Sequence, residues 1–489
     1  MPGNFVPAAA ELFRFSPELL LTLAGTLLML LESIIAPARK RTILPVVAFV
    51  SLLAALGLAV FGASDPGPAF NGLLVLDGFA TFFRVLVMTI GLVVILMSTN
   101  YLHQAQHEGG EYYALVLFSI IGQCLMVSAN ELIMIFIGIE VSSIATYILA
   151  GYLRDDRRNN EAALKYFLLG SFATAFLLYG IAWIYGGTGT TRLSEIRRIL
   201  FDAQVAPSAT LVGAAVALLF VGLLFKISAA PFQMWAPDVY QGAPAPVTAF
   251  LSAGPKAAAF AAFLRISMTA FESAKGYWAP VLWVCALATM VVGNFAALRQ
   301  SNVKRLLAYS SIAHAGYVLV ALTAASDTGV AAAMFYMAAY AAMNLGAFAV
   351  VTHVARQGER RVEISDLAGL GVRQPTTAAL LTVFLLSLIG VPLTGGFFGK
   401  FYIFKAALDS NLIALTVAGL LTSAVAAYYY LRIVVVMYMQ PAPVDNLELP
   451  APSPGIRAAI LVSCAATLIL GVFPSLVLDI AVRGAGAMR

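Results

Sequence analysis

Charged side chains are scarce in this sequence of 489 residues. Only 11% of the residues are aspartate, glutamate, lysine or arginine, whereas about 25% are charged in a typical soluble domain. Apolar residues make up 61% of the chain, and its mean hydropathy is +0.90. This composition excludes an ordinary soluble protein and predicts a chain that lies largely in lipid.

Cysteine and histidine are also rare, which limits the chemistry that the chain can support. Cys124, Cys285 and Cys464 are scattered through apolar stretches, so they predict neither a disulfide framework nor a thiolate metal site. His103 and His107 are four residues apart but have no third ligand nearby. Because no flavin, haem, iron–sulfur or phosphate-binding motif is visible, we predict no catalytic, cofactor-binding or metal-binding residue in this chain.

Long polar segments are missing as well, and short loops separate fourteen apolar spans of about 20 residues each, the length of a membrane-crossing helix. The spans are continuously apolar rather than alternating, which excludes a β-barrel. We therefore predict an all-α polytopic membrane protein with fourteen transmembrane helices. The predicted spans are residues 17–35, 43–63, 74–96, 112–127, 132–152, 161–185, 209–230, 248–270, 277–298, 303–322, 330–353, 376–408, 411–437 and 457–481.

The few charges lie mainly in the loops and predict an orientation. Glu11, Arg14 and Glu18 flank the first span and argue against a signal peptide, so this span is kept as a helix. With the N-terminus outside, most lysines and arginines fall on one side, which the positive-inside rule assigns to the cytoplasm. Both termini are then non-cytoplasmic. The polar segment 186–208 lies on the outer side; 193–201 is a candidate amphipathic helix, although a simple connector is the preferred interpretation.

Ionisable residues inside the apolar spans repeat at a fixed distance. Glu140 precedes Lys226 by 86 residues, and His314 precedes Lys400 by the same number. The offset of 174 residues between the two pairs covers five helices, and an odd number inverts the second copy. We predict inverted repeats of helices 4–8 and 9–13. The corresponding segments are the N-terminal helices 1–3 (1–110), the first repeat (111–275), the second repeat (276–440) and helix 14 (441–489).

Helix breakers interrupt matching spans of the two halves. In the seventh span, Pro231 and Pro237 each remove a backbone donor, and in the twelfth span Pro392 does the same. Three glycines are predicted to loosen the backbone after Pro392, namely Gly395, Gly396 and Gly399. Broken backbone at membrane depth is tolerated only where it is buried in protein or lines a wet cavity, and transporter folds place their sites there. We therefore predict discontinuous helices 7 and 12.

Five ionisable groups at membrane depth are candidates for carrying charge, since such groups are costly and by default functional. A lysine such as Lys226, held between desolvation and the carboxylate of Glu140, can change protonation when its partner moves. Lys256 lies well inside its span, and His314 can relay protons through two ring nitrogens. Lys400 follows the second break, where the positive end of a half-helix would oppose its charge. Alternatively, these five groups form static ion pairs or hydrogen bonds and carry no charge.

The two halves are not equivalent, and further charged residues lie inside the predicted spans. Lys256 maps to Tyr430 and Lys165 to Ala339, so both lysines lack an ionisable base in the second half. Lys165 lies one turn inside its span and either joins proton translocation or snorkels to the interface. Two charges in the third span, Asp77 and Arg84, are expected to form a structural pair.

Three long segments carry a family resemblance. They are residues 226–256 (KISAAPFQMWAPDVYQGAPAPVTAFLSAGPK), 304–317 (KRLLAYSSIAHAGY) and 390–401 (GVPLTGGFFGKF). Together they resemble the antiporter-like membrane subunits of respiratory complex I, bacterial NADH–quinone oxidoreductase, and the similarity extends over essentially the whole chain. Lys400 favours the N type over the M type, which usually has glutamate there. The end of the chain after helix 14 disfavours the L type.

The resemblance implies a subunit of the bacterial plasma membrane that helps to pump protons while other subunits oxidise NADH and reduce quinone. FMN, iron–sulfur clusters and quinone would be bound by those subunits. The implied partners are M-type and small membrane subunits and lipid, not nucleic acid. The family's helix 5 glutamate and helix 7 lysine correspond to Glu140 and Lys226, and its helix 8 and 12 lysines to Lys256 and Lys400. Gln233 departs from the pattern, because relatives often have histidine there.

We therefore expect a proton-translocating subunit in which a polar line crosses the middle of the membrane. Its members would be Glu140, Lys226, Lys256, His314 and Lys400, with Lys165 as a further candidate. A cation/proton antiporter subunit of an Mrp-like or hydrogenase-linked complex would use the same charges. A scaffold that anchors a complex without moving protons is a second alternative, and an independent redox enzyme lacks any motif in its favour.

Overall fold

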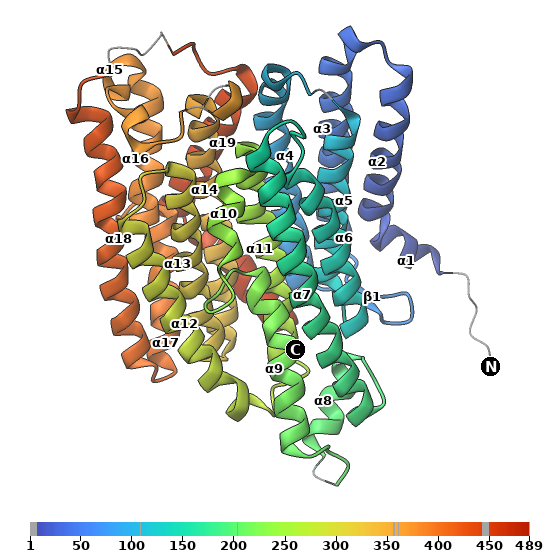
Figure 1. Ribbon diagram of the computed structural model, residues 1–489. Coiled ribbons are helices and arrows are strands. Elements are labelled where there is room, and N and C mark those ends of the chain that lie inside the picture. Colours follow the sequence, from blue (N-terminus) through green and yellow to red (C-terminus); the bar gives the residue numbers. More distant parts are fainter. Residues whose placement is uncertain are drawn as a thin grey trace.

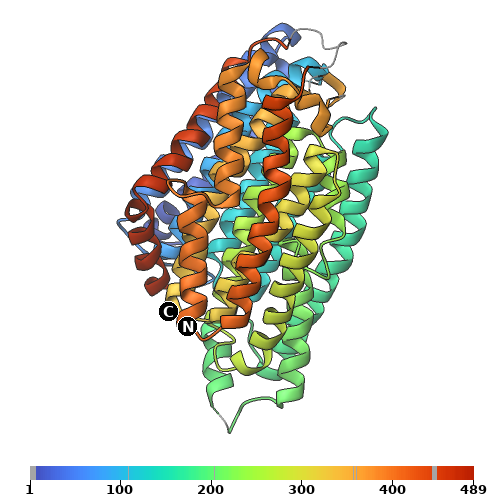
Figure 2. The same ribbon diagram turned by 90° about the vertical axis from the view of Figure 1, so that its left-hand side faces the viewer.

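The computed structural model describes residues 7–107, 109–202, 204–355, 357–359, 361–442 and 449–488. Most of these residues form long helices that run side by side (Figures 1 and 2). A short antiparallel pair, β1 (Gly67–Ala69) with β2 (Leu74–Leu76), and two 3₁₀ turns, η1 (Gln357–Glu359) and η2 (Ile364–Leu367), lie between them. The helices are α1 (Ala9–Arg14), α2 (Ser16–Ile34), α3 (Pro37–Gly62), α4 (Gly78–Ala105), α5 (Gly110–Ser128), α6 (Leu132–Ala150), α7 (Arg157–Thr188), α8 (Leu193–Phe201), α9 (Ala209–Lys226), α10 (Trp235–Gly242), α11 (Ala245–Met268), α12 (Lys275–Leu298), α13 (Val303–Ala324), α14 (Asp327–Ala355), α15 (Leu370–Arg373), α16 (Pro375–Ile389), α17 (Gly395–Asp409), α18 (Ile413–Met439), α19 (Pro454–Val472) and α20 (Ser475–Ala487).

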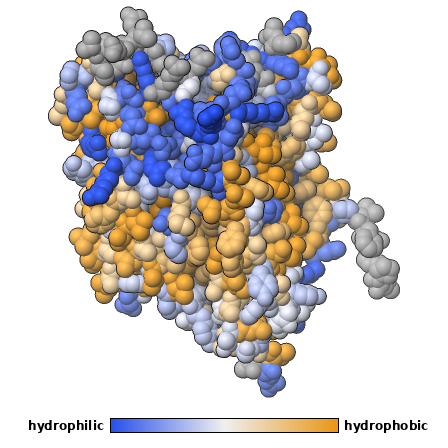
Figure 3. Space-filling view, in the orientation of Figure 1, coloured by the Kyte–Doolittle hydropathy of each residue, from blue (hydrophilic) through white to orange (hydrophobic). Residues whose placement is uncertain are grey.

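The helices have the length and surface that a membrane requires. Within the part of the chain that the structure describes, thirteen helices are long and apolar enough to cross a bilayer, and the remaining predicted span, 376–408, is divided into α16 and α17. Large apolar side chains such as Leu23, Phe172 and Leu421 are exposed. Apolar residues form a band across the surface, and hydrophilic residues gather toward the top of the view (Figure 3). The predicted all-α membrane fold is confirmed.

Polar residues directly before several helices determine where these helices begin. The carboxylate of Asp77 accepts a hydrogen bond from the Ala80 backbone at 2.7 Å at the start of α4, and Asn302 accepts one from Arg305 at 3.1 Å at the start of α13. The first N–H groups of a helix have no partner within the helix, so these side chains satisfy donors that would otherwise be orphaned in lipid.

The predicted pair of Asp77 and Arg84 does not form. Asp77 instead binds Arg265 of α11 at 2.8 Å, and Arg84 binds Glu18 of α2 at 2.6 Å. Seven residues along a helix axis correspond to about 10 Å, which is too far for a direct contact. The neighbouring helices bring opposite charges much closer, so the two pairs tie α4 to α11 and to α2.

The helix α11 lies at the centre of the molecule. Each of its 24 residues is buried, and α4, α5 and α14 pack against it. The most extensive packing in the chain joins α5 to α6 and α12 to α13, which are helices 4 and 5 and helices 9 and 10 of the predicted repeats. This equivalence agrees with a duplication, while the inverted relation and the segment boundaries stay predictions.

The segment at 193–201 is helical, so its interpretation as a simple connector was wrong. In α8 the apolar side chains of Leu193 and Ile196 are buried, while Arg197 binds Glu272 at 2.7 Å. Burial of one apolar side stabilises a helix that is too short to persist alone. The helix α8 and the C-terminal end lie in the lower half of the view, whereas α15 lies at the top (Figure 1).

Candidate functional site

The seventh predicted span is broken, as expected, between α9 and α10. α9 ends at Lys226, residues 227–234 are not helical, and α10 begins at Trp235. The Trp235 indole donates to the Phe225 carbonyl at 2.9 Å and so satisfies a backbone group near the end of α9. Pro237 does not contribute to the break. It is the third residue of α10, where a missing N–H costs no intrahelical hydrogen bond.

The twelfth predicted span is broken between α16 and α17. The C-cap Gly390 has φ 98°, a left-handed conformation that glycine adopts without strain, and it ends α16 after Ile389. The expectation that three glycines loosen the following backbone was wrong, because all three lie in the continuous helix α17. They permit close packing instead: a Cβ on Gly396 would lie 1.9 Å from the Ser387 carbonyl oxygen.

The position of Lys400 also corrects the expected electrostatics. Lys400 is the sixth residue of α17, so it does not lie at the positive end of that helix. Its ammonium donates to the carbonyls of Leu388 and Ile389 at 3.0 and 2.8 Å and to the Ser423 hydroxyl at 2.7 Å. The last carbonyls of a helix carry partial negative charge, so α16 stabilises the cation. In both halves a lysine therefore lies where the first half-helix ends.

Glu140 and Lys226 come together across α6 and α9. The Lys226 ammonium donates to the Ser143 hydroxyl at 2.5 Å and lies over the rings of Tyr147 and Tyr166, at 5.4 and 5.5 Å. Glu140, Ser143 and Tyr147 share one face of α6 because they are spaced three and four residues apart. The Glu140 carboxylate interacts electrostatically with Lys226, but no ion pair within 4.0 Å joins them among the described residues. Its Oε1 atom is buried without a hydrogen-bond partner in the same part of the chain.

Three aromatic side chains connect Lys226 to Lys256. The rings of Tyr166 and Trp235 are stacked at 4.5 Å, and those of Trp235 and Tyr240 lie 6.1 Å apart. The Lys256 ammonium in turn lies 5.4 Å from the Tyr240 ring. These three rings, which we call the aromatic bridge, occupy the stretch between the two lysines. Tyr240 is fully buried, and its hydroxyl has no hydrogen-bond partner within the described chain.

Lys256 and His314 meet through Ser311. The Lys256 ammonium donates to the Ser311 hydroxyl at 2.5 Å, and Ser311 and His314 lie three residues apart on α13. A cavity of about 10 Å³ lies among these three side chains and the phenols of Tyr336 and Tyr340. This volume is close to the roughly 10–15 Å³ that one water molecule requires. The polar side chains around this cavity can all donate or accept a hydrogen bond, so they could hold such a water molecule.

His314 continues the line toward Lys400. Its ring nitrogens hydrogen-bond to two phenols, with Nδ1 close to Tyr336 and Nε2 at 3.2 Å from Tyr430. His314 interacts electrostatically with both Lys256 and Lys400, and the Lys400 ammonium lies 4.9 Å from the Tyr317 ring. The structure therefore brings Glu140, Lys226, Lys256, His314 and Lys400 into one connected series, which we call the polar line.

Lys165 does not join the polar line. Its ammonium binds Glu161 at 2.7 Å and Asp238 at 2.9 Å, and its side chain is 41% exposed. Arg305 binds the other oxygen of Asp238 at 2.6 Å. A surface cavity of about 220 Å³ lies beside this group, so Lys165 extends to a charged surface as snorkelling predicts.

Sequence reasoning missed a buried ion pair between Lys304 and Glu359. The Lys304 ammonium also donates to the Ala243 carbonyl at 2.5 Å. Glu359 accepts further hydrogen bonds from the Tyr101 hydroxyl at 2.8 Å and the Ala245 backbone at 2.6 Å. In the sequence, Lys304 lies at the start of the tenth predicted span, and no partner was predicted for it. The available signal was its spacing of seven and ten residues from Ser311 and His314, which places all three on one face of α13.

Three comparisons identify the family. Residues 129–426 match the family model described as NADH:quinone oxidoreductase/Mrp antiporter, TM. The chain is 59% identical to NADH-quinone oxidoreductase subunit N 1 of Solibacter usitatus over 98% of both chains, and 45% identical to subunit N of Trichlorobacter lovleyi over 95% of both. It is also similar to a chain of respiratory complex I from Thermus thermophilus with bound aureothin, with TM-score 0.80, 36% identity and coverage of 95% and 98%. The chain thus belongs to the subunit N branch of the NADH:quinone oxidoreductase/Mrp antiporter family.

Proposed function

We propose that this chain is the proton-translocating N-type membrane subunit of a NADH–quinone oxidoreductase. It lies in the bacterial inner membrane with both termini in the periplasm, beside M-type and small membrane subunits. It carries out no redox step, and NADH, FMN, iron–sulfur clusters and quinone belong to partner subunits. In support, the described residues contain no group of three or more His, Cys, Asp or Glu side chains fit to hold a metal, and the three cysteines are buried in three different helices.

One observation carries the proposal, namely the continuity of the polar line from α6 to α17. Serine hydroxyls hold the ammonium groups of Lys226 and Lys256, and tyrosine hydroxyls hold both nitrogens of His314. A hydroxyl can accept one proton while it donates another, so these groups can pass a proton between neighbouring bases. The aromatic bridge is the one stretch without an ionisable base, and there Tyr240 supplies a phenol.

Coulomb interaction couples the members of the polar line. Two unit charges about 4 Å apart interact by about 4 kcal/mol at an effective dielectric constant of about 20, and twice that distance still leaves about 2 kcal/mol. Since about 1.4 kcal/mol changes a proton affinity tenfold, moving one charge changes the protonation of its neighbour. A redox-driven change in an adjacent subunit can therefore travel along the line as a sequence of protonation changes.

We place Lys165 at the surface end of the proton route rather than within the polar line. Its cluster with Asp238 borders the surface cavity, and Asp238 belongs to α10, which also contributes two members of the aromatic bridge. A proton that enters from this side would pass from water to groups on α10. We assign Lys165 to this exchange with bulk water.

The test uses the assembled complex reconstituted in vesicles, with Lys226→Ala and Lys400→Ala compared with the native chain. We expect fewer protons pumped per NADH oxidised in both variants, since each removes one base from the line. Lys405→Ala is the matched control, because Lys405 is exposed on the same helix as Lys400. Unchanged pumping per electron in both variants would overturn the proposal.

The same variants separate the alternatives. Pumping that requires sodium, or sodium transport by purified protein without redox partners, would favour a cation/proton antiporter. Loss of the whole complex from the membrane, rather than loss of pumping by an assembled complex, would favour a scaffold. Blue-native electrophoresis of each variant distinguishes these outcomes before pumping is measured.

A further inference from the structure

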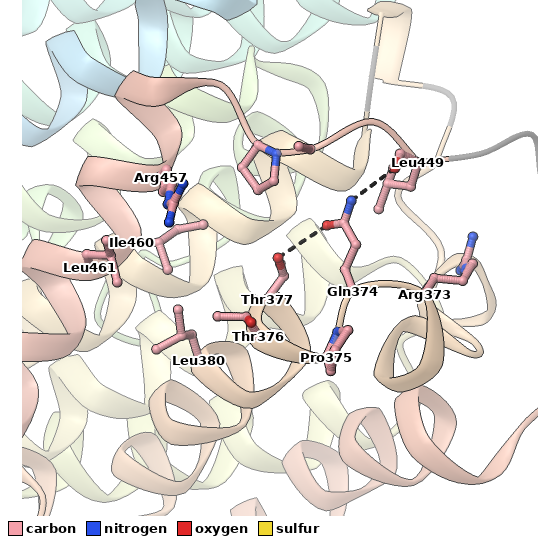
Figure 4. A pocket seen from close by; sticks show the side chains of 12 residues that line it. Arg373, Gln374, Pro375, Thr376, Thr377, Leu380, Leu449, Arg457, Ile460 and Leu461 are labelled. Carbon is pink, nitrogen blue, oxygen red and sulfur yellow. Dashed lines mark hydrogen bonds between the residues drawn. The ribbon is translucent and has the colours of Figure 1, made fainter.

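A cavity of about 460 Å³ opens between α16 and α19 (Figure 4), beside α15, which lies at the top of the molecule in Figure 1. It is separate from the polar line, and its volume falls within the range of about 300–1,000 Å³ that is usual for small-molecule sites. The first turn of α16 and the first turns of α19 both border it. We call it the α16–α19 pocket.

The outer part of the pocket is cationic. Arg373 and Arg457 both border it, from α15 and α19 respectively, and Figure 4 shows them on opposite sides of Thr376 and Thr377. The Arg373 guanidinium already donates to the Ala368 carbonyl at 2.7 Å, so Arg457 is the one that is available to a ligand. The Arg457 side chain is exposed and has no hydrogen bond or ion pair with another described residue. The first turns of two helices add positive partial charge, so the electrostatics of this mouth favour an anion.

The inner part of the pocket is apolar. Leu380 of α16 and Ile460 and Leu461 of α19 form it. Leu461 is 48% exposed, so this side of the pocket continues onto the apolar surface that faces lipid. A soluble anion would use only the cationic mouth, whereas a molecule with a charged head and a hydrocarbon chain would use both parts.

We propose that the α16–α19 pocket binds an anionic phospholipid of the cytoplasmic leaflet. The headgroup phosphate lies between Arg457 and the first turn of α16, and an acyl chain covers Leu380 and Leu461. Basic pockets between transmembrane helices on the cytoplasmic side are typical sites for anionic lipid headgroups. This inference uses the orientation given under the proposed function but does not depend on proton transfer along the polar line.

A bound lipid would also hold one half of the discontinuous helix in place. The lipid contacts the first turn of α16, and the last two carbonyls of the same helix bind the Lys400 ammonium. α16 has 15 residues, so its two ends are only about 22 Å apart. Occupancy of the pocket therefore restrains the helix that positions one base of the polar line.

The test measures lipid binding to the purified, delipidated complex by native mass spectrometry. Short-chain phosphatidylglycerol is the probe, and phosphatidylcholine and inorganic phosphate are the competitors. Arg457→Gln removes the charge, and Leu461→Trp fills the apolar part. Arg299→Gln is the matched control, because Arg299 is an exposed arginine outside the pocket on the same predicted side. We expect about fivefold weaker phosphatidylglycerol binding in Arg457→Gln, since one basic residue near anionic lipid contributes about 1 kcal/mol.

Three results would overturn the proposal. Both pocket variants could bind phosphatidylglycerol as tightly as the native chain, inorganic phosphate could compete as well as the lipid does, or cross-linking from position 461 could capture a neighbouring subunit instead of lipid. Proton pumping per NADH is measured in the same samples. Normal lipid binding in both pocket variants overturns the lipid proposal whatever the pumping rate, whereas the proton-translocation proposal fails only if Lys226→Ala and Lys400→Ala pump normally.

Discussion

Each lysine of the polar line is held by neutral oxygen atoms rather than by a carboxylate in direct contact. Lys226 and Lys256 donate to serine hydroxyls, and Lys400 donates to two carbonyls and a serine hydroxyl. Removing one partner of a buried ion pair leaves an uncompensated charge, whereas a neutral acceptor tolerates both forms of a lysine. These contacts therefore suit groups that must gain and lose protons.

The Ser311 hydroxyl is the contact whose loss should be most informative. Ser311→Ala removes the acceptor of the Lys256 ammonium, and an unsatisfied buried donor costs about 1–3 kcal/mol. We expect proton pumping by the assembled complex to slow by about fivefold or more, since each 1.4 kcal/mol corresponds to about a factor of ten. Ser267→Ala is the control, because the Ser267 hydroxyl is buried and has no hydrogen-bond partner among the described residues. Equal rates in both variants would contradict this role for Ser311.

The buried pair of Arg84 and Glu18 is expected to stabilise the fold without a role in transport. Arg84→Ala leaves the Glu18 carboxylate buried alone, which costs about 3–5 kcal/mol, whereas the double variant Arg84→Met with Glu18→Leu should recover most of this loss. Thermal unfolding of the complex measures the loss of stability in the single variant and its recovery in the double variant. If Arg84→Ala were as stable as the native chain, water would have to reach the Glu18 carboxylate, and the pair would not be buried as described.

The buried bases were predictable because a charge inside an apolar span is visible in one dimension. Glu140, Lys226, Lys256, His314 and Lys400 were identified in this way, and the structure brings them together, although their role in proton transfer stays a proposal. The aromatic bridge was not predictable, because tyrosine and tryptophan are common in apolar spans and their meeting depends on how helices pack. The partners of Asp77 and Arg84 were missed for the same reason.

At the scale of elements, the two breaks differ in sequence but place their lysines similarly. Lys226 is the last residue of α9, while Lys400 reaches from α17 back to the end of α16. The breaks were predictable from Pro231 and Pro392, which lie between the half-helices, whereas the left-handed backbone of Gly390 was not predicted. The contact of Lys400 with α16 was not, because it requires the angle between two half-helices. The segment 193–201 was interpreted as a connector, because a helix as short as α8 is stabilised only by tertiary packing, which the sequence does not show.

Close packing in the second break yields an element-scale prediction. In Gly396→Ala the added Cβ would lie 1.9 Å from the Ser387 carbonyl oxygen, so α16 and α17 must separate. We expect a loss of about 1–3 kcal/mol in stability, typical of overpacking, together with reduced pumping. Gly186→Ala in α7 is the control, since its Cβ would meet no atom within 4 Å. Thermal unfolding of the two variants in membranes should differ, and equal stability would argue against tight packing at Gly396.

At the scale of the whole molecule, the distribution of charge defines an orientation that labelling can test. The native cysteines Cys124, Cys285 and Cys464 are buried, so an introduced cysteine reports its own position. Val372 and Val205 are exposed, at 85% and 63%, near opposite ends of the helices. We expect a membrane-impermeant thiol reagent to label Val372→Cys only in inverted vesicles and Val205→Cys only in intact cells. The opposite pattern would reverse the orientation given by the positive-inside rule.

The complete enclosure of α11 has a consequence for how the protein is made. This helix carries Lys256 and Arg265, and a charged residue at the centre of a lone helix costs about 2.5–3.5 kcal/mol on insertion into a bilayer. Its neighbour α14 emerges from the ribosome later in synthesis. Both charges disfavour α11 as a lone helix in lipid, so we expect it to reach its final position only after α14 has entered the membrane.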